Sequence, residues 1–419
     1  MIQSAEKKII VGLDIGTTKI STLIGEILLD GTINIIGVGN CLSRGMHNGT
    51  INDLESITKC IKKSIHQAEI MSKTHVSSIY LAFSNKDIHC QNEIGMIPIR
   101  HKEVTKNDIN HVIYTAKSVK IYHEHHILHV IPQEYEIDHQ IEIKNPIGLS
   151  GMRMKAHVHL ITCHKTTKNN IIKSINQCGI KVNQLIFSGL ASSQSVLNNE
   201  EKESGVCLID MGGGTLDITV YIAGILQHSQ VIPYAGNIIT NDIAYALSTS
   251  QTNAENIKTI HGIENSLMIE NSEHIEVMNI SGINTQKFKK SILNEVIELR
   301  CCELFNIVNN EIIAIQKKLK ENGKKYQILS GIVLTGGSAK LKSLKMCAEK
   351  IFKKKVRIGL PHPIPGLINN FNDPNYSTVI GLLYYGKKHY IQKQQKKINK
   401  KNYFQIWLKK INYWIQKKK

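Results

Sequence analysis

Aromatic side chains are scarce in this 419-residue sequence: they make up 5% of it, and only two are tryptophans. The nine cysteines are scattered with no CxxC pair, so we expect neither a disulfide framework nor a zinc site. Residues 1–10 lack the apolar stretch of a signal peptide, and no later run approaches the length of a membrane span. We therefore expect a globular protein of two domains that stays in a reducing cytosol.

Two common nucleotide-binding patterns are also missing. No GxxxxGK[ST] segment occurs, and GVGNCLSRG (residues 37–45) fails the GxGxxG pattern because Leu42 stands where the third glycine belongs. Two histidine-rich segments, residues 122–130 and 155–160, alternate like strands but have no matched set of cysteine or carboxylate ligands. We interpret these histidines as ordinary surface or core residues.

Negative charge is absent from the C-terminal region. Residues 374–419 contain twelve lysines and no aspartate or glutamate, so they supply +12 of the formal net charge of +18. The remaining +6 is spread over the first 373 residues, which does not indicate a basic face for nucleic acid. We expect no nucleic-acid partner for the body of the protein.

Both tryptophans lie in the last eighteen residues, NYFQIWLKKINYWIQKKK. At 100° per residue the apolar side chains of this segment fill one arc of about 120°, and they are Phe404, Trp407, Leu408, Ile411, Trp414 and Ile415. The segment is too short and too charged to span a bilayer, and residues 386–402 before it are typical of a flexible basic tether. We predict a helix that lies in an anionic membrane surface; a helix docked on the protein's own core and a basic tail that binds nucleic acid are the alternatives.

Two strand-turn-strand segments with polar tips, residues 7–27 and 204–224, indicate an internal duplication. Each has an apolar strand, an aspartate near its end, a tip with glycine and threonine, and a returning strand. Glycine lets backbone N–H groups approach a phosphate closely, and Asp14 and Asp210 are placed to hold a hydrated Mg²⁺ between the tips. The predicted phosphate-binding residues are Gly16, Thr17, Thr18, Lys19, Gly212, Gly213, Gly214 and Thr215.

A third glycine-rich element, GIVLTGGSAKLKSL (residues 331–344), is predicted to be a strand that leads into a helix through Gly336, Gly337 and Ser338. The three elements resemble the two phosphate motifs and the adenosine motif of the actin, Hsp70 and sugar-kinase superfamily. The segments 185–197 and 376–386 resemble the two helices that connect its lobes. This superfamily binds ATP, so the resemblance implies ATP and Mg²⁺ as cofactors.

Within that superfamily the chain resembles the FtsA family of bacterial cell division, over nearly its full length. The stretches that carry the resemblance are NIIGVG, SRGM, INDLES, CQNEIGM, HVIPQEY, NPIGLSGMRMKAHVHLITCH, VIPYAGN and VRIG. They imply an α/β, two-lobed actin-like ATPase fold with an FtsA-type insertion, subdomain 1C, and a C-terminal amphipathic helix. The implied boundaries are 1–83 and 163–195 for lobe 1, 84–162 for 1C, 196–331 for lobe 2 with 2B near 250–325, 332–386 for the adenosine segment and the return to lobe 1, 387–402 for a basic linker, and 403–419 for the terminal helix.

The resemblance also implies residues that contact the nucleoside. In NAENIKTIHG (residues 253–262), Glu255 and Lys258 match a helix that contacts the nucleoside in the superfamily. Because they are three residues apart, their side chains share one face of the helix. The implied set is Gly236, Asn237, Glu255, Lys258, Gly336, Gly337 and Ser338. Related ATPases have Gln or Glu at the start of the first connecting helix, where this chain has Ser188. Serine is a poor base, so we expect slow hydrolysis and name no catalytic residue with assurance.

The partners that the resemblance implies are the C-terminal peptide of FtsZ, further copies of the chain in an actin-like polymer, an anionic membrane, and later division proteins at 1C. The segment 287–312 has a helical apolar period and is predicted to bind the FtsZ peptide through Lys289, Lys290 and Arg300. The implied function is to tether FtsZ filaments to the cytoplasmic side of the inner membrane and help assemble the septal ring. The alternative is a small-molecule kinase or an active ATPase of the same fold.

Overall fold

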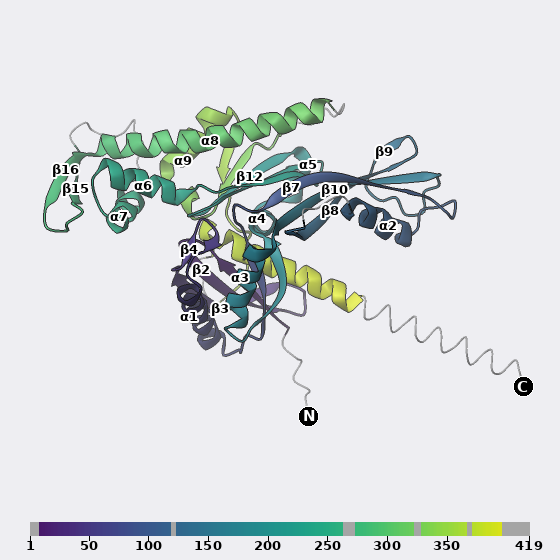
Figure 1. Ribbon diagram of the computed structural model, residues 1–419, viewed down its shortest axis with the longest axis horizontal. Coiled ribbons are helices and arrows are strands. Elements are labelled where there is room, and N and C mark those ends of the chain that lie inside the picture. Colours follow the sequence, from purple (N-terminus) through teal and green to yellow (C-terminus); the bar gives the residue numbers. More distant parts are fainter. Residues whose placement is uncertain (1–7, 119–122, 263–272, 322–327, 367–370, 396–419) are drawn as a thin grey trace, which may run out of the picture.

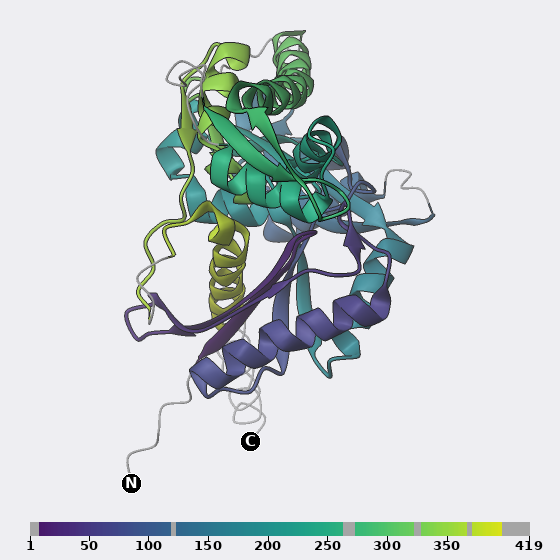
Figure 2. The ribbon, with the colours of Figure 1, turned by 90° about the vertical axis from the view of Figure 1, so that its left-hand side faces the viewer.

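The structure is a computed structural model that describes residues 8–118, 123–262, 273–321, 328–366 and 371–395. Two lobes, each built on a five-stranded sheet, and a third, inserted domain make up the described chain (Figure 1). In the side view lobe 2 lies above lobe 1, with α1 along the lower lobe (Figure 2). The predicted α/β, two-lobed architecture is therefore present.

The sheet of lobe 1 has the strand order β11-β6-β1-β2-β3. The first three strands in sequence form an antiparallel meander, and the other two run parallel to β1. Two helices, α1 and α3, pack on this sheet, and Gly39 is required where α1 crosses because an added Cβ would lie 1.8 Å from the Ser64 carbonyl oxygen. The bounds are β1 Ile9–Ile15, β2 Lys19–Ile27, β3 Ile33–Leu42, α1 Leu54–Ser72, β6 Ser78–Phe83, α3 Lys165–Asn176 and β11 Lys181–Phe187.

The sheet of lobe 2 repeats this plan with the order β14-β13-β12-β17-β18. It again consists of an antiparallel meander followed by two parallel strands, which confirms the duplication predicted from the two hairpins. The two central strands β12 and β13 are buried along their whole length and mostly apolar, as is typical of sheets buried on both faces. The bounds are β12 Val206–Met211, β13 Leu216–Ile222, β14 Ile225–Ile232, α6 Gly236–Ala246, β17 Ile332–Thr335, α9 Lys342–Phe352 and β18 Val356–Ile358.

The inserted domain is a four-stranded sheet of order β7-β10-β8-β9 with α2 on one face. Val112 and Ala116 of α2 are fully buried against the sheet beside Gly95, where a Cβ would lie 2.2 Å from the Val112 carbonyl oxygen. The bounds are β7 His89–Pro98, α2 Lys106–Lys117, β8 His125–Ile137, β9 Gln140–Ile143 and β10 Arg153–His164. Of the two histidine-rich segments, residues 125–130 lie in β8 and residues 155–160 lie in β10, as predicted, whereas residues 123 and 124 form a turn and residue 122 lies outside the described residues.

The outer part of lobe 2 carries a helix, a hairpin and a long helix. The bounds are α7 Gln251–His261, β15 His274–Met278, β16 Thr285–Lys289 and α8 Lys290–Glu321. The sequence predicted helical periodicity from residue 287, but residues 287–289 pair with β15 as the end of β16. The helix therefore begins three residues later than predicted.

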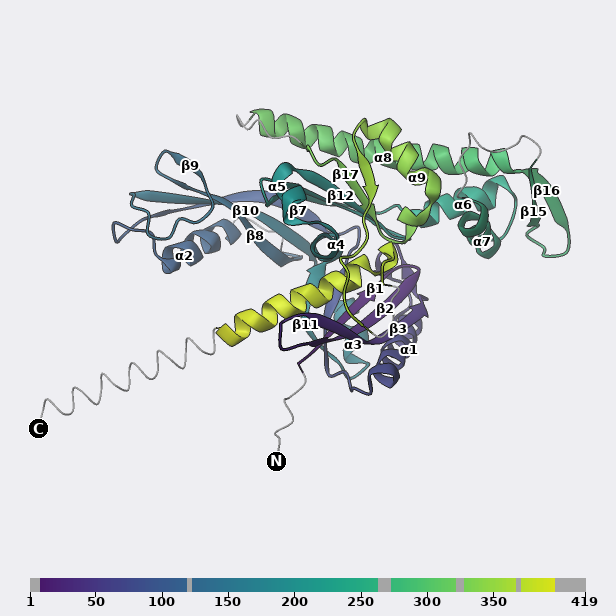
Figure 3. The same ribbon diagram turned by 180° about the vertical axis from the view of Figure 1, so that it is seen from behind.

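Two helices cross between the lobes: α4, Ser188–Val196, and a helix over residues 377–395 that follows a short 3-10 turn at Pro374–Tyr376 (Figure 3). They cross closely, because a Cβ on Gly381 would lie only 1.9 Å from the Ala191 carbonyl oxygen. The prediction of a flexible linker from residue 387 is wrong for residues 387–395, which continue this helix. The Tyr80 hydroxyl lies 2.9 Å from Nδ1 of His389, so this part of the helix contacts lobe 1. The sequence alone showed no core-forming period here.

Small elements complete the described chain: β4 Met46–His47, β5 Thr50–Ile51, α5 Asn199–Ser204 and the 3-10 turn Gly337–Lys340. All nine cysteines are free thiols in the structure. Among the helices that the structure describes, none combines the length and apolarity needed to cross a bilayer.

Candidate nucleotide-binding site

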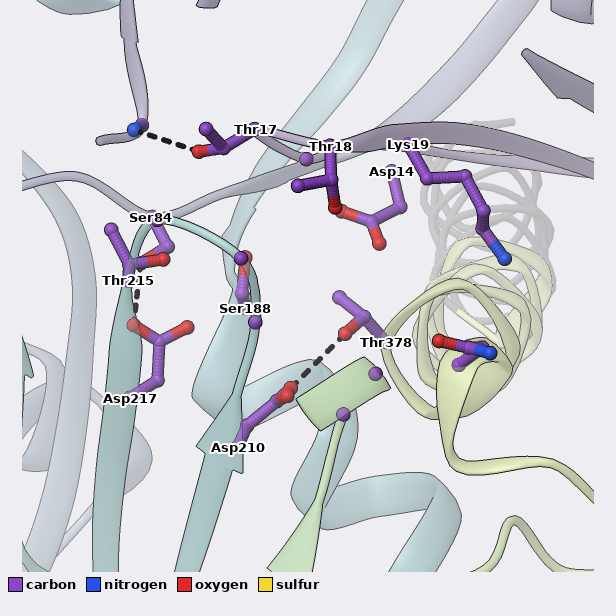
Figure 4. Close-up of a pocket in the computed structure, with 18 of the residues that line it drawn as sticks. Asp14, Thr17, Thr18, Lys19, Ser84, Ser188, Asp210, Thr215, Asp217 and Thr378 are labelled. Carbon is purple, nitrogen blue, oxygen red and sulfur yellow. Dashed lines mark hydrogen bonds between the residues drawn. The ribbon is translucent and has the colours of Figure 1, made fainter. Parts of the chain in front are cut away.

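The tips of the two hairpins meet at one pocket between the lobes (Figure 4). The first tip connects β1 to β2, and the second connects β12 to β13. The third glycine element enters the pocket from β17, although a 3-10 turn separates this strand from α9. The predicted residues that line the pocket are Asp14, Gly16, Thr17, Thr18, Lys19, Asp210, Gly212, Gly213, Gly214, Thr215, Gly336 and Gly337.

The second tip needs glycine because the first tip faces it closely. A Cβ on Gly213 would lie 2.4 Å from Cγ2 of Thr18, and one on Gly214 would lie 2.3 Å from Oγ1 of Thr17. Gly336 has a φ of +86°, and a Cβ there would lie 2.3 Å from a carboxylate oxygen of Asp210. Side chains at these positions would push the three elements apart, so the sequence leaves backbone and hydroxyl groups around the pocket.

Asp210 is buried at the end of β12 and is held by two hydroxyl groups. Ser192 of α4 donates a short hydrogen bond to its carboxylate, and Thr378 of the helix 377–395 donates a second one at 3.1 Å. Burial raises the pKa of Asp210, and the two hydroxyl donors oppose that rise. The carboxylate thus ties both crossing helices to the pocket.

Asp14 lies at the pocket end of β1. Burial, and after it the negative charge of Asp210, raise the pKa of Asp14 to about 7, while Lys19 lowers it. The Lys19 ammonium lies 4.2 Å from the centre of the Tyr376 ring, and burial lowers its own pKa. The pocket therefore holds carboxylates whose charge is only partly balanced by a cation of the chain.

A third carboxylate, Asp217, was not predicted from the sequence. It lies on β13, is 4% exposed, and accepts a 2.5 Å hydrogen bond from Ser84, the last residue before the inserted domain. Burial and the charge of Asp210 hold its pKa well above the usual range. The signal was an acidic residue inside the otherwise apolar strand LDITVYI. Gly49, Ser84, Asn375 and Thr378 also line the pocket and were missed because they come from unrelated segments.

Five predicted nucleoside residues lie beside the pocket and do not line it: Gly236, Asn237, Glu255, Lys258 and Ser338. The backbone N–H groups of Gly236 and Asn237 donate to the carbonyl oxygens of Gly212 and Gly213, and the Ser338 hydroxyl donates to that of Gly212 at 2.8 Å. These hydrogen bonds hold the backbone of the second tip on the side away from the pocket lining.

Glu255 and Lys258 share a face of α7, as predicted, and form an ion pair of 2.6 Å. The Lys258 ammonium is buried and also donates to the Gly236 carbonyl oxygen, at 3.2 Å, and to Thr240, at 2.8 Å. This network joins α7 to the start of α6. Contact with a nucleoside stays a prediction for both residues.

Ser188 is the first residue of α4, as predicted, and it lines the pocket. It is 8% exposed, and its hydroxyl is the only ionisable or hydrogen-bonding group that its side chain brings to this place. The carboxylates that line the described pocket are those of the three aspartates, on β1, β12 and β13.

The three residues predicted for the FtsZ peptide do not form one surface. Lys289 is exposed at the end of β16, whereas Lys290 is 7% exposed and pairs with Glu273 at 2.9 Å. Arg300 of α8 donates to Asp242 of α6 through Nε, at 2.5 Å, and Nη2, at 3.1 Å, and it also pairs with Glu303. The predicted membrane residues, Phe404, Trp407, Leu408, Ile411, Trp414 and Ile415, lie outside the described residues.

No group of three or more His, Cys, Asp or Glu side chains is arranged to hold a metal ion directly in the part of the chain that the structure describes. The carboxylates of Asp14, Asp210 and Asp217 nevertheless approach one pocket from three strands (Figure 4). Their mutual repulsion disfavours the fully ionised state, so a cation bound there would be stabilised.

Comparisons with known proteins agree with this architecture. The model of the family "Cell division protein FtsA" matches residues 207–381, and that of the "SHS2 domain inserted in FTSA" matches residues 85–162. Solved structures with a similar fold include the PilM–PilN type IV pilus biogenesis complex, with a TM-score of 0.65, 13% identity and coverage of 90% of this chain and 98% of that one. MreB5 of Spiroplasma citri bound to ADP has a TM-score of 0.54, with 16% identity and coverage of 93% and 98%.

Two curated relatives match the whole chain. The cell division protein FtsA of Buchnera aphidicola subsp. Acyrthosiphon pisum is 54% identical over 417 residues, and that of Escherichia coli K12 is 51% identical over 419 residues. Each alignment covers 100% of both chains. With the actin-like fold and the inserted domain, this identity shows that the chain belongs to the FtsA family of cell division proteins.

Proposed function

We propose that the protein binds ATP with Mg²⁺ in the pocket between the two hairpin tips. The main observation behind this proposal is that the two glycine-containing tips of the duplicated lobes face each other beside three carboxylates, of which Asp210 and Asp217 are buried. A bound Mg²⁺ would offset the charge of these carboxylates and of the phosphates. Within the chain, Asp14 and Asp210 would hold the ion through water, because Mg²⁺ usually keeps several of its waters.

The tips would hold the phosphates by their backbone N–H groups and hydroxyls. Thr17 and Thr18 supply hydroxyls from lobe 1, and Thr215 supplies one from lobe 2. Lys19 adds a positive charge at the mouth of the pocket, where it lies over Tyr376. The absence of side chains on Gly213 and Gly214 lets anionic oxygens approach the backbone from both lobes.

In this proposal ATP acts mainly as a conformational ligand. Serine at position 188 cannot take up a proton from water as a carboxylate does, and Asp210 is already occupied by two hydroxyl donors. Weak orientation of water should leave binding intact and make hydrolysis slow. The bound nucleotide would then fix how the lobes meet.

A role in cell division follows from the family, and we propose that it consists in tethering FtsZ filaments to the cytoplasmic face of the inner membrane at the septum. The acidic, apolar C-terminal peptide of FtsZ would bind beside α8, where Lys289 is exposed and Leu299 is 66% exposed next to Arg300. The apolar stripe of residues 403–419, with its lysines, suits an anionic leaflet. Copies joined in an actin-like polymer would present many tails to one surface and hold more firmly than one copy.

Nucleotide binding is tested by titrating the full-length protein with a fluorescent ATP analogue, with Mg²⁺ and with EDTA. Asp210→Ala should weaken binding in Mg²⁺ much more than in EDTA, because it removes a group that would hold the ion. Asp30→Ala is the matched control, since Asp30 is an exposed aspartate in the turn between β2 and β3. If the Asp210→Ala variant bound the ATP analogue as the parent does in Mg²⁺, the proposed site would be refuted.

A further inference from the structure

The inserted domain belongs to lobe 1 by chain connection but is hydrogen-bonded to lobe 2. Its strands leave and rejoin lobe 1 after β6 and before α3. Its sheet nevertheless packs against β14, the edge strand of the lobe 2 sheet. Figure 1 shows β7, β8 and β10 running alongside the lobe 2 sheet while lobe 1 lies below.

One buried side chain, His159 of β10, lies at the centre of this contact. Its Nε2 is 2.7 Å from the hydroxyl oxygen of Ser229 on β14, and its Nδ1 is 2.5 Å from the side-chain oxygen of Asn92 on β7. Asn92 in turn donates through its amide nitrogen to the Gln227 carbonyl oxygen of β14 at 3.2 Å. The Asn92 oxygen can only accept, so His159 donates to it from Nδ1. The Ser229 hydroxyl lies between Nε2 of His159 and the sulfur atom of Cys90 on β7, to which it donates at 3.0 Å.

A second buried contact lies on the neighbouring strand. Gln133 of β8 is 9% exposed, and its amide nitrogen donates to the carbonyl oxygen of Leu226, at 2.8 Å, on β14. The two contacts are specific in direction and buried, so the sheets cannot slide past each other without leaving polar groups unpaired. The interface therefore favours one discrete position of the inserted domain on lobe 2.

The contacted strand is next to a strand of the nucleotide pocket. β14 pairs with β13, where Ser229 lies opposite Thr219 and Val231 lies opposite the pocket residue Asp217. Ser84, which directly precedes the inserted domain, also hydrogen-bonds to the pocket residue Asp217. Because β14 is paired with β13, a change in the spacing of the two tips would shift both strands together relative to β6 and would act on the contacts of His159 and Gln133 with β14.

We propose that the inserted domain is a second bridge across the cleft, clamped to lobe 2 by the His159–Ser229 and Gln133–Leu226 contacts, so that nucleotide occupancy and ligand binding to the inserted domain are coupled. The inference rests on the proposed binding of ATP. Binding coupling is reciprocal: if nucleotide changes the affinity of the inserted domain for a ligand by some factor, then that ligand must change the affinity of the pocket for nucleotide by the same factor.

The test is hydrogen–deuterium exchange of the full-length protein with and without Mg²⁺–ATP, read out by peptides covering β7 and β10. We expect nucleotide to change exchange in these peptides in the parent protein. The double variant Ser229→Ala, Gln133→Ala should lose that response and bind nucleotide with an affinity altered by about fivefold or more. Gln91→Ala is the matched control, because Gln91 is the exposed neighbour of Asn92 on β7.

The possible failures are distinguishable. If nucleotide binds the parent but exchange in β7 and β10 does not change, or if the double variant responds as the parent does, the bridge is refuted while the nucleotide site stands. If a fluorescent ATP analogue fails to bind the parent at all, the proposed function and the coupling are both wrong. A loss of response in Gln91→Ala equal to that of the double variant would also contradict the assignment of the clamp.

Discussion

Ser84 of lobe 1 donates a 2.5 Å hydrogen bond to the buried carboxylate of Asp217 in lobe 2. The same hydroxyl lies 3.3 Å from that of Thr215, at the second hairpin tip. A single side chain, directly before the inserted domain, thus joins the two lobes at the nucleotide pocket. Because Asp217 is surrounded by protein, it depends on this donor more than an exposed carboxylate would.

Replacing Ser84 with alanine should destabilise the nucleotide-free protein. Removing the donor of a buried carboxylate costs about 1–3 kcal/mol, and each kcal/mol lowers the melting temperature by about 2–4 °C in a domain of 150–250 residues. Thermal unfolding followed by circular dichroism measures the shift. The control is Ser43→Ala, whose buried hydroxyl has no hydrogen-bond partner among the described residues, so its loss should cost little. Equal shifts in the two variants would show that the bond between Ser84 and Asp217 does not join the lobes.

Binding of Mg²⁺–nucleotide should weaken as the pH falls below 7. The pKa of Asp14 is raised to about 7 in the empty pocket, so below that pH a proton occupies the carboxylate and the cation must displace it. Affinity should fall by up to about tenfold per pH unit between pH 7 and 6 for one displaced proton. Titrations at pH 8, 7 and 6 measure this, and the variant Asp14→Asn separates the contribution of Asp14 from that of the nucleotide's own protonation.

Asp14 also determines how the stability of the nucleotide-free protein changes with pH. The folded-state pKa of Asp14 lies above its unfolded value of 3.8, so the folded protein holds more protons between pH 4 and 7. This contribution to stability is present at low pH and is lost as the pH rises through 7. Asp14→Asn should therefore raise the melting temperature of the empty protein more at pH 8 than at pH 5. A larger gain at pH 5 would contradict the raised pKa.

Hydrolysis of ATP should be slow and nearly indifferent to Ser188→Ala, because serine contributes no strong base at the start of α4. Phosphate release over hours measures the rate. The second variant is Ser188→Gln. Glutamine can orient water, so this change should raise the rate of hydrolysis if the pocket lacks a group that positions water. A fast parent enzyme that loses its activity in Ser188→Ala would restore the interpretation as an active ATPase.

Charge reversal at Arg300 should weaken binding of the FtsZ C-terminal peptide by about tenfold or more, the size expected when an interfacial charge pair is replaced by repulsion. Arg300 already pairs with Asp242 and Glu303, so Arg300→Glu also breaks a contact between α6 and α8. Asp242→Asn separates the two effects, because it removes the same ion pair but keeps the positive charge. Fluorescence anisotropy with a labelled peptide measures both. If Asp242→Asn weakens binding as much as Arg300→Glu, then Arg300 is structural and does not contact the peptide.

The sequence predicted the parts of the fold that repeat or depend on glycine. Both hairpins with Asp14 and Asp210 near their strand ends and the strand before Gly336 are where the pattern placed them, and α4 begins at Ser188, as the family resemblance implied. The hairpins depend on local chemistry: short apolar runs build the buried strands, and close approach of the tips requires glycine at 213 and 214.

Features that depend on tertiary packing were missed or misjudged. Ser84 and Asp217 meet only because two lobes close on each other, which no local pattern reports. Residues 387–395 are helical because they continue a helix that packs on lobe 1, although their basic composition is typical of a linker. Lys290 and Arg300 follow Lys289 in a segment that was predicted to be helical, but burial and ion pairs inside lobe 2 separate their side chains from that of Lys289.

The most direct test of the central claim, a nucleotide-binding tether between FtsZ and the membrane, is co-sedimentation of FtsZ with anionic vesicles. The account predicts that FtsZ pellets with vesicles only when the full-length protein is present, and that Trp407→Glu or Trp414→Glu abolishes this while leaving binding of the ATP analogue unchanged. High salt should weaken attachment without abolishing it, because the apolar stripe remains. If both charged variants carry FtsZ to the vesicles as well as the parent does, the terminal segment is not the anchor and the account is wrong.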